Sequence, residues 1–467
     1  MNAPALVRTA VPPGAIAAVG TAVMVAAMAT ATAPNVAGAQ AASAAQARID
    51  VSTLSNGLRL QLLEDHTSQV VSVSLWYDVG ARDETKGKTG FAHLFEHMMF
   101  QGSEHVKKAE HSQLLERAGG RSNANTQYDI TRYYAEIPSN RINLALWLEA
   151  ERLRSLTVNA ENLKNQIEAV KEERRLRVDN APYGKALWES TFPVFDAASC
   201  FAYAHSLIGS MDDLNASSVA DVKEFFERYY APNNAVLTIV GDFQPAEAKK
   251  LVNEYFGSIA RQPDQPKPTC EQKFNTGAMH ARVTDDKATL PAVLAIYRIP
   301  ATAHADTPAL DLLASILGAG ESSRFNKVLA RETKLALGQQ VLVNPFGPRR
   351  GAGMFLTLAI TNQGVNPDSL AARIQAEFAR VAAAGVTAAE LAKARNQYRA
   401  GKVNERQRAF DMTEAIQAAT FYLGSPEAVF TDLDRYDKVT VADVKRVAAT
   451  YLVPANSLVV TIVPEAK

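Results

Sequence analysis

The stretch that decides how the chain is interpreted is His93-Leu94-Phe95-Glu96-His97. Two histidines four residues apart lie one turn apart on the same face of a helix, so both imidazoles can bind one metal ion. Glu96 lies between them, and its carboxylate projects beside the same site. A catalytic zinc site usually has a third protein ligand. Until one is found, histidines satisfied by hydrogen bonds inside a core helix explain the pattern equally well.

The order of the motif is informative in itself. His-x-x-Glu-His is the inverted form of the zinc-binding motif found in one large group of metallopeptidases, with the glutamate acting as a base. The apolar neighbours Phe91, Leu94 and Met98 predict that one flank of this helix is buried.

Residues 1–41 are predicted to be a cleavable export signal. The only charged side chain before residue 48 is Arg8, an apolar run follows from Ala15 to Met28, and small residues surround Ala39. A charged start, a moderate apolar core and a small-residue exit are typical of secretory signals. We therefore expect an exported protein, either periplasmic or secreted.

Composition excludes some classes of partner. Lys+Arg and Asp+Glu both number 49, so the chain has no net positive charge that would attract nucleic acid or an anionic membrane. No stretch after the signal approaches the ~18 apolar residues of a membrane span. The two cysteines, Cys200 and Cys270, would be allowed to form a disulfide in an oxidising compartment, but their spacing leaves the pairing open.

The residues after the signal predict alternating strands and helices. Strands are expected at 51–63 (a hairpin with a turn at 55–57), at 69–77 and at 130–137; helices are expected at 109–118, 142–153 and 163–178. The last helix carries Glu168, Glu172 and Glu173. One of these carboxylates could complete the metal site, although charged residues on a helix are usually a solvated face.

The chain contains an internal duplication. Seven of the fourteen residues at 219–232 are identical to those at 441–454, and each copy is followed by an apolar strand. We expect an α+β domain at 48–258, a proline-containing linker at 259–278 and a second α+β domain at 279–467. The second copy has no His-x-x-Glu-His, so only the first is expected to bind zinc.

Two stretches resemble one known family. Gly80-Ala81-Arg82-Asp83-Glu84, followed by the residues from Gly90 to Ser103, is similar to the metal-site signature of the M16 (pitrilysin-like, insulinase-like) zinc metallopeptidases. The resemblance implies a third ligand from a Val-x-x-Glu helix, which selects Glu173, 76 positions after His97, over Glu172. The family often has a supporting glutamate seven residues before this ligand. Gln166 stands there instead, a departure that weakens any such role.

The resemblance also implies an architecture. It predicts two homologous α+β domains, each a mostly antiparallel sheet with helices packed on it, forming half of a clamshell chamber. A homodimer or a heterodimer with a second M16-like chain would complete the chamber. It also implies that Asn123 and Ala124 lie on a strand whose backbone pairs with the substrate peptide. Arg349 and Arg350 lie in roughly the region where some members steady the substrate carbonyl.

The resulting functional prediction is a zinc-dependent endopeptidase that hydrolyses peptides or unfolded polypeptides through a metal-activated water. His93, His97 and Glu173 would hold Zn²⁺, and Glu96 would be the catalytic base. The main alternative is a non-catalytic or partner-dependent subunit of an M16-like assembly. A zinc-storage protein is a second alternative.

Overall fold

The computed structural model describes residues 48–466, so the predicted export signal lies outside them. Two mixed β-sheets, each with helices packed against it, make up this part of the chain. The α+β class is therefore confirmed. Within the described residues, no helix is long and apolar enough to cross a membrane.

The first sheet has the strand order β1-β2-β6-β3-β5-β4. Its strands are β1 (Asp50–Thr53), β2 (Arg59–Glu64), β3 (Val70–Tyr77), β4 (Arg121–Thr126), β5 (Thr131–Pro138) and β6 (Ala235–Gly241). All neighbours pair antiparallel except β2 and β6, which are parallel. The predicted hairpin is β1 and β2, and β4 pairs only with β5 in the described part of the chain.

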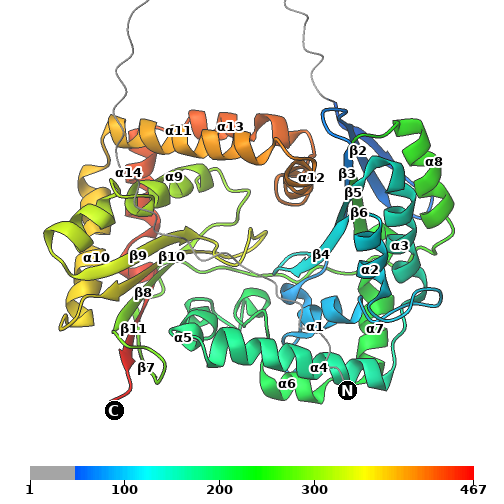
Figure 1. Cartoon of the computed structure of the whole chain (residues 1–467). Helices are drawn as coiled ribbons and strands as arrows, with labels where there is room; N and C mark the ends of the chain where they lie inside the picture. The colour runs from blue at the N-terminus through cyan, green and yellow to red at the C-terminus, as the bar shows by residue number, and fades with distance from the viewer. Residues whose placement is uncertain (1–47, 467) are drawn as a thin grey trace, which may run out of the picture. The chain divides into compact units, whose positions relative to one another are not determined.

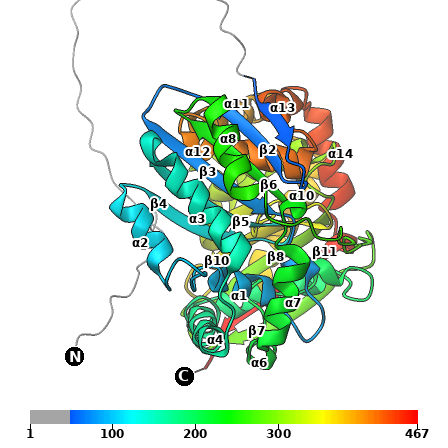
Figure 2. The ribbon, with the colours of Figure 1, turned by 90° about the vertical axis from the view of Figure 1, so that its right-hand side faces the viewer.

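Helices of the first half cover one face of this sheet and one end of it. Figure 2 shows α3 and α8 lying across the face, where they contribute to a continuous apolar core. The helices of this half are α1 (Phe91–Met98), α2 (Glu110–Arg117), α3 (Ile142–Ser155), α4 (Ala160–Arg174, continued by a π-helical turn Arg175–Asp179), α5 (Gly184–Trp188), α6 (Met211–Ala216), α7 (Val219–Tyr229) and α8 (Pro245–Phe256).

The second sheet repeats the topology of the first. Its order is β7-β11-β8-β10-β9, which matches β2-β6-β3-β5-β4 strand for strand, including the single parallel pair. Its strands are β7 (Met279–Asp285), β8 (Ala292–Ile299), β9 (Ala336–Val343), β10 (Gly353–Thr361) and β11 (Ser457–Pro464). The same strand order in both halves confirms the duplication.

The helices of the second half are α9 (Thr307–Gly318), α10 (Pro367–Ala384), α11 (Ala388–Glu405), α12 (Ala409–Ala418), α13 (Ala428–Asp437) and α14 (Val441–Tyr451), as labelled in Figure 1. Strand β8 begins at Ala292, directly after Pro291, which has no N–H to give to the ladder. Strand β7 was not expected, since its residues are mostly polar and it lies at the sheet edge.

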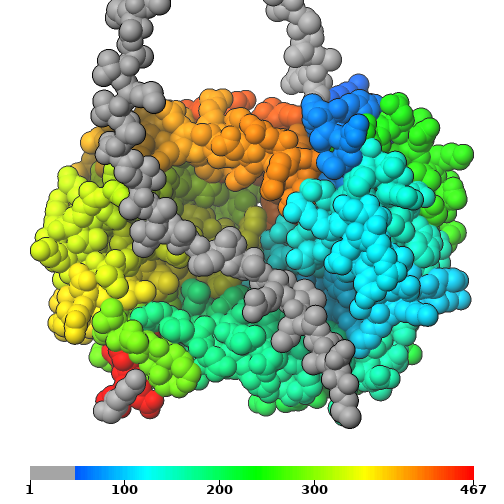
Figure 3. Space-filling model, in the orientation of Figure 1, coloured from blue at the N-terminus to red at the C-terminus, as the bar shows by residue number. Residues whose placement is uncertain are grey.

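Each sheet is also covered by a segment from the other half. Helix α12 packs on β3 and β6 of the first sheet, and Gln417 donates to the carbonyls of Ser74 and Val236 over 3.1 and 2.8 Å. In Figure 3 the orange surface of this region adjoins the blue and cyan surface of the first half. Reciprocally, Phe192 and Val194 pack with the apolar side chains of the second sheet. Strand β3 is consequently buried on both faces, although apolar and polar residues alternate from Val71 to Leu75.

No helix or strand lies between the end of α8 and the start of β7. Within this segment Cys270 forms a disulfide with Cys200, which lies in the loop region before α6. The pairing that the sequence left open is thus formed, and it fixes the connecting segment to the first half.

Candidate metal centre

Helix α1 is preceded by Gly90 at its N-cap position, and its first amides are capped by the side chain of a residue outside the helix. Gly90 has φ +80° and offers no side chain to the first turn. The buried carboxylate of Glu84 accepts hydrogen bonds from the amides of Gly90 and Ala92 over 2.9 and 2.8 Å instead. Leu94 and Phe95 are fully buried in the core. This packing leaves the side that carries the two histidines and Glu96 facing the site.

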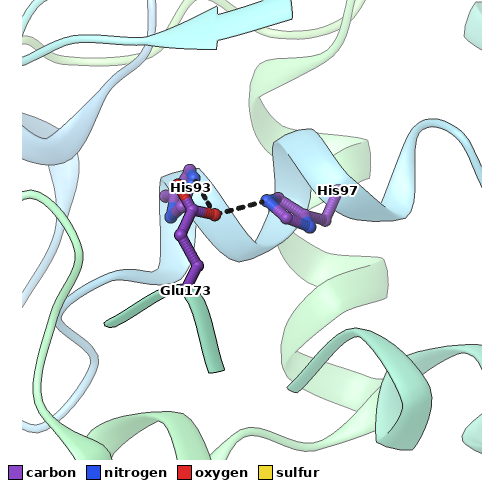
Figure 4. A group of neighbouring side chains, drawn as sticks. All are labelled: His93, His97 and Glu173. Atoms are coloured by element: carbon purple, nitrogen blue, oxygen red, sulfur yellow. Dashed lines mark ion pairs between the residues drawn. The ribbon is translucent and has the colours of Figure 1, made fainter. Parts of the chain in front are cut away.

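The third candidate ligand comes from α4, which packs against α1. The Oε2 atom of Glu173 lies 3.6 Å from Nε2 of His93 and 3.4 Å from Nε2 of His97. Figure 4 shows this oxygen between the two imidazole rings. Glu172 instead pairs with Arg175, and its side chain is 59% exposed. Of the two adjacent glutamates, the structure brings only Glu173 to the histidines.

The donor set fits zinc in type and spacing. One atom from each of His93, His97 and Glu173 lies within 4.8 Å of the others. Ligands about 2.05 Å from a tetrahedral Zn²⁺ stand roughly 3.3 Å apart, close to the two histidine–carboxylate distances. No second group of three His, Cys, Asp or Glu with such spacing occurs in residues 48–466.

Electrostatics favour the protonation state that a metal ligand needs at two of the three candidate ligands, His93 and Glu173. Burial and the neighbouring His97 lower the pKa of His93 to about 4, so its imidazole is neutral at pH 7. Burial raises the pKa of Glu173, but His97, His93 and Arg177 outweigh it and lower this pKa to about 2. At His97, burial lowers the pKa, but Glu173 and Glu96 outweigh burial and raise it. The site thus offers an ionised carboxylate and at least one neutral imidazole.

Two side chains contact the candidate ligands at the atoms that do not face the metal position. Oε1 of Gln166 lies 3.3 Å from Nδ1 of His97, and Nη2 of Arg177 lies 3.0 Å from Oε1 of Glu173. An acceptor at the second ring nitrogen fixes the tautomer of a ligand histidine. Gln166 therefore keeps a contact with the site despite its departure from the family pattern, as a neutral amide in place of a carboxylate.

Glu96 faces the same site and is oriented by the neighbouring sheet. The hydroxyl of Thr126, at the end of β4, donates to Oε2 of Glu96 over 2.7 Å. Burial raises the pKa of Glu96, and the hydrogen bond from Thr126 opposes this rise. Two other residues of β4 were predicted to bind substrate: Asn123 is exposed and Ala124 is partly buried on this edge strand.

The two arginines of the second half are engaged elsewhere. Arg349 is fully buried, with its guanidinium 4.2 Å from the ring centre of Tyr128. Arg350 pairs with Asp78. The structure therefore corrects the suggestion that these side chains lie ready to meet a substrate carbonyl, because one is enclosed by aromatic rings and the other is held in an ion pair.

Sequence reasoning missed Thr126 and the roles of Glu84 and Arg177. Arg177 stands four residues after Glu173, which is the spacing of a helical ion pair and could have identified it. Glu84 lies in the stretch from Gly80 that was noted only for its resemblance. No local pattern marks Thr126, since its contact with Glu96 joins a strand to a helix 30 positions away.

Comparisons with known proteins agree with this geometry. The family model for "Insulinase (Peptidase family M16)" matches residues 59–190, and that for "Peptidase M16 inactive domain" matches residues 217–398. The zinc protease PqqE of Helicobacter pylori is 32% identical over 418 residues, covering 88% of this chain and 92% of the relative. The mitochondrial-processing peptidase subunit beta of Blastocladiella emersonii is 25% identical over 424 residues, covering 89% of each chain.

Solved structures show the same fold. A protease from Helicobacter pylori superposes with a TM-score of 0.84 at 29% identity, over 90% of this chain and 100% of that one. The first half of the periplasmic protease PqqL from Escherichia coli gives a TM-score of 0.71 at 19% identity, over 89% and 92% of the two chains. Relatives that are named zinc proteases imply zinc binding in the family. From the matches to both halves and the similarity to PqqE over nearly its whole length, the chain belongs to peptidase family M16.

Proposed function

We propose that this chain is a zinc-dependent endopeptidase that hydrolyses peptides or unfolded polypeptides. The observation that carries the proposal is the convergence of His93, His97 and Glu173 on one point beside Glu96. Two imidazoles and a carboxylate leave a fourth position open, which distinguishes a catalytic zinc site from a structural one.

In this proposal His93, His97 and Glu173 would hold the ion. When bound there, Zn²⁺ supplies a Lewis acid that polarises the scissile carbonyl and lowers the pKa of water. Glu96 accepts a proton from the attacking water and delivers it to the nitrogen of the leaving amine. Because Thr126 holds Oε2 of Glu96, Oε1 is the atom available to take that proton.

The proposed substrate site is the unpaired edge of β4. An extended peptide can add to such an edge through main-chain hydrogen bonds, with side-chain pockets giving selectivity. Asn123 and Ala124 lie in the middle of this strand, three and two residues before Thr126, respectively. A segment that must lie as an added strand has to be unfolded, so we propose short or unfolded peptides as substrates.

The proposed organisation is a zinc-bearing peptidase domain at 48–258, a linker at 259–278 and a peptidase-like domain without zinc at 279–467. Together they would form half of a closed chamber, completed by a second copy or by another M16-like chain. One relative is named a subunit of a processing peptidase, and residues 217–398 match a model described as an inactive domain. These two observations favour the alternative of a partner-dependent subunit.

We propose that the protein acts outside the cytoplasm, in the periplasm or as a secreted protein. The disulfide between Cys200 and Cys270 supports this, since disulfides persist in oxidising compartments and are rare in the cytosol.

The test is hydrolysis of a quenched fluorescent peptide by the purified mature chain. We expect cleavage that a chelator abolishes and zinc restores. His93→Ala should lose the metal, as shown by elemental analysis, and with it the activity. A chain that binds one zinc but cleaves nothing alone, and gains activity only with an added M16-like chain, would support the partner-dependent alternative. Zinc binding without cleavage in any combination would contradict the proposal.

A further inference from the structure

Thr126 occupies a different environment from the rest of its strand. The other residues of β4 are exposed or partly buried, whereas Thr126 is only 5% exposed. Side chains along a strand alternate between faces, so Thr126 shares a face with Ala124, which packs against the core that includes α1. Thr126 is thus the residue at which the proposed peptide-binding strand meets the metal helix.

The position of the Thr126 hydroxyl is set by backbone pairing. Thr126 is opposite Thr131 in the β4–β5 register, and the amide of Gln127 donates to the carbonyl of Ile130 over 2.8 Å to close the hairpin. The carbonyl of Gln127 in turn accepts from the amide of Ala81 over 3.0 Å. A β-branched side chain in a strand has few χ1 rotamers. The donor is therefore fixed by the sheet.

The side chain of Glu96 is not β-branched, so its own backbone does not fix the position of its carboxylate. It is a long side chain on α1, and Thr126 holds its carboxylate toward β4 through the 2.7 Å hydrogen bond from the hydroxyl, assisted by the backbone of the same residue. We infer that Thr126 is a positioning residue that sets the orientation of Glu96, and that it links peptide binding on β4 to the placement of the base. This inference rests on the proposed function, in which Glu96 is the catalytic base.

Peptide binding and the orientation of Glu96 are linked because both depend on the short strand β4. A peptide that pairs with the backbone at Asn123 and Ala124 orders the strand whose last residue holds Glu96. Misplacing a catalytic group by about 1 Å can cost on the order of 100-fold in rate. The contribution of Thr126 should therefore appear in turnover more than in binding.

The variants Thr126→Val and Thr126→Ser test the inference, because valine keeps the shape and removes the donor while serine keeps the donor. We expect Thr126→Val to lower kcat by about 10- to 100-fold with KM changed less than about twofold. Its zinc content should equal that of the wild type. Thr126→Ser should restore kcat to within about threefold of the wild type. In crystals of the metal-free variants, Glu96 should occupy several rotamers with valine and one with serine.

Thr238→Val is the matched control, since Thr238 is also buried, lies in β6 and donates to Gln61 over 2.9 Å. It should affect stability but leave kcat unchanged. The inference is overturned if Thr126→Val retains wild-type kcat, if Thr126→Ser fails to restore it, or if Glu96 keeps one rotamer without the hydroxyl. If the zinc-loaded wild type cleaves no peptide, the proposed function fails, while the rotamers of Glu96 still decide this inference.

Discussion

Arg174 donates a hydrogen bond from Nη1 to the backbone carbonyl of Gly209 over 2.8 Å. Arg174 directly follows Glu173, and Gly209 packs against the backbone of Thr89 and Gly90, where α1 begins. One loop therefore touches the end of the helix that carries the carboxylate and the start of the helix that carries the histidines. We therefore expect the spacing of the three candidate ligands to depend on this contact.

Gly209→Ala should disturb both the fold and the metal site. Gly209 has φ +74°, and an added Cβ would stand 2.2 Å from the carbonyl oxygen of Thr89. We expect a loss of about 3 kcal/mol or more in the free energy of unfolding, measured with urea, and weaker zinc binding. Gly364→Ala is the control, because Gly364 has φ +76° but open space around it, and should cost only about 1 kcal/mol. Equal losses in the two variants would show that the close approach is unimportant.

Substitutions at Gln166 should change the affinity for zinc. Gln166→Met removes the acceptor 3.3 Å from Nδ1 of His97, and we expect zinc affinity to fall by about 10-fold in a chelator-competition titration. Gln166→Glu keeps an acceptor and adds charge, so its affinity should equal or exceed that of the wild type. Identical affinities for the methionine and glutamate variants would rule out a supporting role for this position.

The ion pairs around Asp78 should make stability depend on pH. Burial raises the pKa of Asp78, but the cations of Arg350, Arg82 and Lys267 outweigh it and lower the pKa to about 2. A carboxyl whose pKa is lowered by folding contributes stability above its unfolded pKa, and that contribution is lost as the pH falls toward the folded value.

Asp78→Asn should therefore destabilise the protein by about 2 kcal/mol at pH 7. The difference from the wild type should shrink steadily between pH 4 and pH 2, as urea unfolding at several pH values can measure. A difference that stays constant over this range would contradict the assignment of the effect to the ionised carboxylate of Asp78.

Local sequence patterns predicted the repeated parts of the fold, because helix capping and apolar periodicity depend on residues close together in the sequence. The capped helix and apolar strand that recur from Val219 and from Val441 fold alike in both halves. The motif at 93–97 likewise depends only on helical spacing. The resemblance to the family supplied Glu173, which spacing alone could not separate from Glu172.

Contacts between distant segments were not predictable from the sequence. The burial of both faces of β3 depends on α12, about 340 positions later, and Gln417 is buried only because it meets two strand carbonyls there. Thr126 has an ordinary strand sequence around it, and its role appears only when β4 is seen beside α1. In each case the contacting residue lies on a distant element, so no periodic pattern in the sequence indicates the contact.

The most direct test of the central claim is a comparison of wild type and Glu96→Gln, each analysed for zinc and assayed on the same peptide. Glutamine keeps the size and an acceptor for Thr126 but cannot take a proton. We predict one zinc per chain in both proteins and a fall in kcat of about a thousandfold in the variant. A Glu96→Gln protein that cleaves the peptide at the wild-type rate would contradict the account.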